Sequence, residues 1–107
     1  MTKTVYIVTF DWSTDEPLHM CDVTVFSNPE IACRAFDSIV TGELNPDLSW
    51  VGSEAVIDGV VQDGYAMCTE TDKREHDVYK YWRVEDMNNH ERYSEVVLRS
   101  QEICFED

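Results

Sequence analysis

The segment spanning residues 26–42 constrains the fold most strongly, because it carries the start and stop signals of a helix between two stretches that read as strands. Ser27 and Glu30 have the spacing of a capping box, and Pro29 suits a first helical turn. Gly42 is a natural stop. We therefore predict a helix from about Asn28 to Thr41, with Ser27 as its N-cap.

This segment also has the hydrophobic period of a helix that covers a sheet. Phe26, before the cap, and Ile31, at the fourth helical position, can form a hydrophobic staple. One side of the helix collects the apolar residues Ile31, Ala32, Ala35, Phe36, Ile39 and Val40. We expect this side to pack on the sheet.

Apolar and polar residues alternate before the helix, as in half-buried strands. In the segment 4–12, Val5, Ile7 and Thr9 fall on one face, and the other face carries Tyr6, Val8, Phe10 and Trp12. The alternation resumes over 19–26 after the turn-like residues 13–18. These two segments predict an antiparallel hairpin.

The chain after the helix reads as turns and further strands. The loop 43–54 is expected to bury Leu48 and Trp50, and the pairs Asp58-Gly59 and Asp63-Gly64 predict tight turns before a strand over 65–69. The segment 77–87 alternates again.

The segment 91–103 suits either a helix or a strand, and we favour a strand. A hairpin centred on Asn88-Asn89 would set Glu85 opposite Arg92, and Tyr81 opposite Val96. The resulting fold class is α+β: a single domain over residues 1–107, with an antiparallel sheet of about five strands and one main helix on a face.

The charge of the chain is strongly negative and uneven. It has 22 Asp and Glu against 8 Lys and Arg, a formal net charge of −14. Arg34 is the one base among thirteen acids between residues 11 and 72. We predict that these acids form a partner-binding surface: Asp11, Asp15, Glu16, Asp22, Glu30, Asp37, Glu43, Asp47, Glu54, Asp58, Asp63, Glu70 and Asp72.

Composition and motifs argue against several classes of function. Contacts with nucleic-acid phosphates need clustered Lys and Arg, so we expect no direct binding to nucleic acid and, by the same repulsion, none to an anionic membrane. No apolar stretch approaches the ~20 residues of a membrane span, and we expect a cytoplasmic protein.

No catalytic or phosphate-binding motif occurs, so we expect no enzyme and no cofactor. The cysteines, which lack C-x-x-C spacing, are expected to be reduced, buried and free of metal: Cys21, Cys33, Cys68 and Cys104.

The run VYIVTFDW, followed by VTVFSNPEIACRAFDSIV with its F-S-x-x-E-x-A pattern, resembles small acidic accessory proteins of bacterial phages and mobile elements. The resemblance covers about the first 41 residues. It implies a counter-defence role, such as imitation of DNA to inhibit a restriction or CRISPR nuclease, and it carries over no functional residue.

The leading hypothesis is therefore a non-enzymatic acidic protein that occupies the basic, nucleic-acid-binding groove of a partner. The alternative is a small interaction module or accessory subunit whose acidity is incidental, as in a generic solvated surface or adaptation to high salt. A small-molecule-binding protein or enzyme is the third hypothesis.

Overall fold

The computed structural model describes residues 1–14, 19–49, 51–71 and 78–104. Its main sheet has five antiparallel strands in the order β2-β1-β7-β6-β5, which confirms the predicted α+β class. The structure also has a second, two-stranded sheet and a four-residue helix, which the predicted fold did not include. The elements are β1 (Thr2–Ser13), β2 (His19–Phe26), α1 (Pro29–Glu43), α2 (Gly52–Ala55), β3 (Val56–Ile57), β4 (Val60–Val61), β5 (Tyr65–Thr71), β6 (Val78–Asp86) and β7 (Asn89–Cys104).

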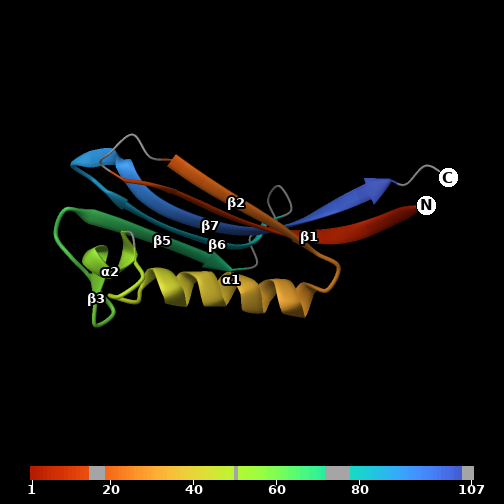
Figure 1. Cartoon of the computed structure of the whole chain (residues 1–107), viewed down its shortest axis with the longest axis horizontal. Helices are drawn as coiled ribbons and strands as arrows, with labels where there is room; N and C mark the ends of the chain where they lie inside the picture. The colour runs from red at the N-terminus through yellow and green to blue at the C-terminus, as the bar shows by residue number, and fades with distance from the viewer. Residues whose placement is uncertain (15–18, 50, 72–77, 105–107) are drawn as a thin grey trace.

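Helix α1 covers one face of the main sheet, and the core lies between them (Figure 1). The alternation predicted for β1 is confirmed, because Val8 and Trp12 are buried on the helix side. The helix contributes Ala32 and Phe36 to the same core. The remaining members of the core come mainly from the last two strands and the residues around α2: Val51, Ala55, Trp82, Val84, Val96 and Leu98.

The opposite face of the main sheet carries no described helix or strand (Figure 1); we call it the open face. Because side chains alternate along a strand, it displays Ile7 of β1 and Val23 and Val25 of β2. Val23 and Val25 are 61% and 55% exposed. No described helix therefore packs on this face, although Val97 of β7, which alternates to it, is buried.

Helix α1 begins one residue later than predicted. Asn28, not Ser27, is the N-cap, and its Oδ1 accepts hydrogen bonds from the amides of Glu30 at 2.8 Å and Ile31 at 3.3 Å. The cause is Pro29, which restricts the preceding residue to extended backbone and so makes Asn28 the last non-helical residue. The predicted capping box and hydrophobic staple are wrong, and Ile31 is exposed.

The end of α1 also differs, because the helix continues through Gly42 to Glu43. The carboxylate of Glu43 is buried, and its Oε1 accepts from the amides of Val51 at 2.7 Å and Gly52 at 2.9 Å and from the Ser94 hydroxyl at 2.7 Å. A Cβ on Gly52 would lie 2.8 Å from the Glu43 Cγ, which explains the glycine there. Glu43 therefore joins α1 to α2 and β7.

The loop after α1 was predicted to bury two large apolar side chains. Leu48 is instead 69% exposed, and Trp50 lies outside the described residues. Buried Val51 supplies the apolar contact from this segment. The Asp58-Gly59 turn is confirmed: both residues have positive φ, 51° and 78°, as a two-residue hairpin turn between β3 and β4 requires.

The ambiguous last segment is the long strand β7, which pairs with both β1 and β6. The predicted register between β6 and β7 is wrong by one residue: Glu85 lies opposite Tyr93, and Tyr81 opposite Val97. The turn begins earlier than predicted, with Asp86 opposite Asn89, and a register shift follows immediately. The position of this irregularity sets the register of the hairpin.

Candidate functional site

The described acids of the predicted surface fall into buried, paired and exposed groups. Asp15, Glu16 and Asp72 lie outside the described residues. Glu43 is 3% exposed and belongs to the interior, so its placement on the surface was wrong. Its three hydrogen-bond donors compensate for burial of the carboxylate, which makes its role structural.

Three more predicted acids have partners within the chain. Asp37 accepts from the Lys80 ammonium at 2.8 Å, and Glu54 forms an ion pair with Arg92. Asp11, on the open face, accepts a hydrogen bond from the Tyr93 hydroxyl at 3.1 Å. The two ion pairs offset negative charge at two places, and the hydrogen bond holds the Asp11 carboxylate in place without neutralising it.

Five predicted acids are exposed and have no ion pair within the described part of the chain: Asp22, Glu30, Asp47, Asp58 and Asp63. Asp22 lies on β2, and Glu30 in the first turn of α1. The other three lie on connections around α2 and the β3–β4 hairpin, at one end of the molecule (Figure 1). We call Asp47, Asp58 and Asp63 the α2-end acids.

Local turn chemistry fixes the α2-end acids. The amide of Asp47 donates to Asn45 Oδ1 at 2.9 Å, and Asp58 occupies the first left-handed position of its hairpin turn. Gly64, with φ of 88°, follows Asp63, and its carbonyl accepts from the Met87 amide at 2.7 Å. This bond brings the β6–β7 turn beside the one that carries Asp63. The carboxylates are therefore held on an ordered surface.

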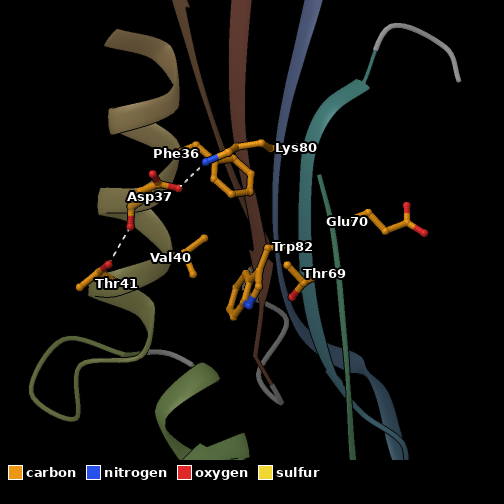
Figure 2. Close-up of a pocket in the computed structure, with 8 residues that line it drawn as sticks. All are labelled: Phe36, Asp37, Val40, Thr41, Thr69, Glu70, Lys80 and Trp82. Atoms are coloured by element: carbon orange, nitrogen blue, oxygen red, sulfur yellow. Dashed lines mark hydrogen bonds and ion pairs between the residues drawn. The ribbon is translucent and has the colours of Figure 1, made fainter. Parts of the chain in front are cut away.

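The last predicted acid, Glu70, borders a groove between α1 and the β5–β6 side of the sheet, and its carboxylate points away from the groove (Figure 2). The volume of the groove is about 300 Å³, and its lining residues are Phe36, Asp37, Val40, Thr41, Thr69, Glu70, Lys80 and Trp82. At the mouth of the groove, the Lys80 ammonium forms an ion pair with Asp37. The same ammonium lies 5.4 Å from the centre of the Phe36 ring. The groove therefore combines an apolar floor with an internally neutralised charge pair at its rim.

The open face carries a polar network that sequence reasoning missed. Glu95 accepts from the Tyr81 hydroxyl at 2.9 Å and from the Arg83 guanidinium at 2.8 Å, and Arg83 also approaches Glu85 at 3.5 Å. The Arg83 guanidinium lies 4.4 Å from the centre of the Tyr93 ring. The available signal was the alternation of β6, which places Tyr81 and Arg83 on the same face.

The network changes the protonation equilibria of its members. Burial, followed by the hydrogen bond to Glu95 and its negative charge, raises the pKa of Tyr81 to about 12. Burial alone would lower the pKa of Arg83, but the hydrogen bond and charge of Glu95 raise it. Burial, with the hydrogen bond to Asp11, raises the pKa of Tyr93. At neutral pH the network thus holds neutral phenols beside a paired guanidinium.

The cysteines are free thiols, but their predicted burial is wrong. Cys21, Cys68 and Cys104 are exposed, and Cys33 is half-buried. Among the described residues, no three His, Cys, Asp or Glu side chains are grouped so that they could hold a metal ion. Within the same residues, no helix has both the length and the apolar character needed to cross a membrane.

Comparisons with known proteins found no relative: no protein-family model matches the chain, and neither a curated protein nor a solved structure matches it.

Proposed function

We propose that this protein is a non-enzymatic acidic protein that binds a basic surface of a partner protein. The observation that carries the proposal is the set of ordered, exposed carboxylates at the α2 end, Asp47, Asp58 and Asp63, which have no ion pair within the described chain. Arg92, a described cation at this end, is already paired with Glu54. A cationic partner would supply the missing counter-charge.

The distribution of positive charge supports this proposal. Six of the eight Lys and Arg residues are described, and three of them, Lys80, Arg83 and Arg92, form ion pairs within the chain. The chain therefore has few cations, part of them already paired, for its 22 Asp and Glu, and its formal net charge is −14. A field of one sign steers a partner of opposite charge and accelerates its association.

The finer proposal is that the partner is a nucleic-acid-binding protein and that the acidic protein imitates DNA in its groove, for example in a restriction or CRISPR nuclease in the cytoplasm. Duplex DNA presents about one negative charge per ~1.7 Å of axis, so a partner evolved for it offers a dense cationic surface. Carboxylates fixed on turns can occupy such a surface without the ordering cost of a flexible acidic tail.

A second candidate is an interaction module that uses the open face and whose acidity is incidental. Val23 and Val25 are exposed at the β2 edge of this face, and Tyr81, Arg83 and Tyr93 lie on the same face, on β6 and β7. Both observations favour this candidate, because exposed apolar surface and aromatic and arginine side chains are typical of binding surfaces. The two candidates use different faces, so substitutions distinguish them.

Matched charge-neutralised variants test the leading proposal. The first changes Asp47, Asp58 and Asp63 to Asn, which keeps the side-chain shape and tolerates the left-handed turn position. The control changes Glu102 and Glu106 to Gln and Asp107 to Asn. It has the same net charge. Its one described position, Glu102, lies opposite Thr4 of β1, close to the end of β7. That end of β7 is far from α2 (Figure 1).

Partners are first captured from the native host on the immobilised parent and identified by mass spectrometry. Association rates are then measured for parent, variant and control at several salt concentrations, with duplex DNA as competitor. We expect the first variant to associate about ten-fold more slowly at low salt and the control to change much less. Equal losses, or a complex that DNA does not displace, would count against DNA mimicry.

A further inference from the structure

Strand β2 forms one edge of the main sheet, and among the described strands it pairs with β1 alone. Residues 20–25 are all exposed, and Asp22 is the only Asp, Glu, Lys or Arg in the strand. A long edge strand with exposed apolar residues and little charge is a template for pairing with another strand. β2 also places Val23 and Val25 side by side on the open face.

When the sequence of β2 is reversed about Val23, polar residues fall opposite polar residues and apolar residues opposite apolar ones. We propose that two copies of the chain associate through antiparallel pairing of β2 with β2, about a two-fold axis at Val23. This register sets Val23 opposite Val23 of the second copy, Val25 opposite Cys21, Asp22 opposite Thr24 and Phe26 opposite Met20. Apolar residues meet apolar residues, and the Thr24 hydroxyl can donate to the carboxylate of Asp22.

The neighbouring symmetric registers are worse. The two-fold axis of an antiparallel strand pair is perpendicular to the sheet, and opposed residues must point to the same face. Each symmetric register is therefore centred on one residue that lies opposite its own copy. Centring on Asp22 sets the two Asp22 carboxylates directly opposite each other, and centring on Thr24 sets Asp22 opposite Phe26. Like charges opposite each other destabilise a strand pair, and an unpaired charge against an aromatic ring loses hydration.

The other edge strand, β5, does not offer the same match. Its fullest symmetric register centres on Cys68 and sets Ala66 opposite Glu70. That register brings a carboxylate to the interface without a donor side chain opposite it. Pairing of β2 with β5 would be heterologous and would build open-ended chains of molecules instead of a closed dimer.

The β2 dimer has a defined shape. The two sheets become one continuous sheet, with both α1 helices on the same side and both open faces on the other. Val23 and Val25 of each copy then meet Val23 and Cys21 of the other, which covers part of the exposed apolar surface on β2.

The charge of the chain sets the salt dependence of this association. Each copy carries −14, so the two repel each other at long range. The Debye length falls from about 10 Å at 0.1 M salt to about 3 Å at 1 M salt. Added salt is therefore expected to strengthen the dimer.

Sedimentation equilibrium of the full chain, over a range of concentrations at about 0.1 M and about 1 M salt, tests the proposal. We expect a monomer–dimer equilibrium with tighter association at high salt. Val23→Lys, which sets two ammonium groups opposite each other, should remain monomeric where the parent dimerises. Val60→Lys is the matched control, because Val60 is 62% exposed on β4 and Val23 is 61% exposed on β2; it should dimerise like the parent.

A cross-linking variant tests the register. Val25→Cys in a Cys68→Ser, Cys104→Ser background should form a disulfide-linked dimer with Cys21 of the second copy under mild oxidation, because opposed residues in antiparallel strands have Cα separations that suit a disulfide. Adding Cys21→Ser should abolish the cross-link. A monomer at both salt concentrations, open-ended oligomers, or a cross-link that survives Cys21→Ser would each overturn the proposal.

Discussion

Replacing Glu43 tests how α1, α2 and β7 are held together. One carboxylate oxygen accepts three hydrogen bonds, from the Val51 and Gly52 amides and from Ser94, and the residue is 3% exposed. Glu43→Ala leaves three buried donors without an acceptor, at about 1–3 kcal/mol each. We expect the free energy of unfolding to fall by about 4 kcal/mol or more, an unusually large loss for one substitution.

Glu43→Gln keeps an acceptor oxygen but removes its charge. Hydrogen bonds to a charged group contribute about 1.5–3 kcal/mol and neutral ones about 0.5–1.5 kcal/mol, so weakening three bonds would cost about 3–4 kcal/mol. A neutral amide is less costly to bury than a carboxylate, which should bring the net loss to about 2–3 kcal/mol. Urea unfolding followed by tryptophan fluorescence measures both losses. Glu30→Ala, an exposed change on the same helix, is the control and should cost less than about 1 kcal/mol. A loss for Glu43→Ala no larger than this control would refute the reasoning.

Further predictions concern the helix start, the core and the open face. Asn28→Ala should lower the free energy of unfolding by about 1 kcal/mol, whereas Ser27→Ala should be nearly neutral; equal effects in urea unfolding would contradict the observed cap. Phe36→Ala should cost about 3 kcal/mol or more, because it opens a cavity beneath α1; a neutral result in the same assay would contradict its burial. Tyr81 should ionise at about pH 12 in an ultraviolet titration, and Glu95→Gln should lower that pKa only in part, since burial is the larger cause; ionisation near pH 10 in the parent would contradict the network. Because the folded pKa of Tyr81 is raised, its contribution to stability should be complete below about pH 10 and lost as pH rises towards about 12, which unfolding measured against pH would show.

Features set by neighbouring residues were predictable from the sequence. The faces of β1 follow from its period of two, and the Asp58-Gly59 turn follows from the tolerance of both residues for positive φ. The helix start could also have been found, because Pro29 restricts Asn28 to extended backbone. The capping-box pattern at Ser27 concealed this signal.

Features set by the path of the chain were not predictable in the same way. In the sequence, Glu43 is not distinguishable from a surface glutamate. Its three hydrogen-bond donors belong to residues 51, 52 and 94, which only the fold places beside it. The Asp37–Lys80 and Glu54–Arg92 pairs join residues 43 and 38 positions apart. The number of acids in the candidate surface was therefore readable from the sequence, but their division into buried, paired and exposed groups required the fold.

Salt and one substitution separate the two proposals. Binding to a basic partner should weaken as salt rises, because the attraction is screened, whereas β2 self-association should strengthen, because repulsion is screened. Asp22→Asn adds a local test. In the proposed dimer the two Asp22 residues are diagonal neighbours across the strand pair, with their Cα atoms about 7–8 Å apart. Removing both charges while keeping an acceptor for Thr24 should tighten the dimer and reduce its dependence on salt. The α2-end acids are intact in this variant, so its association with a basic partner should change little. A dimer whose dependence on salt is unchanged by Asp22→Asn would refute the register centred on Val23. It would leave the proposed binding of a basic partner to be judged by the α2-end variants alone.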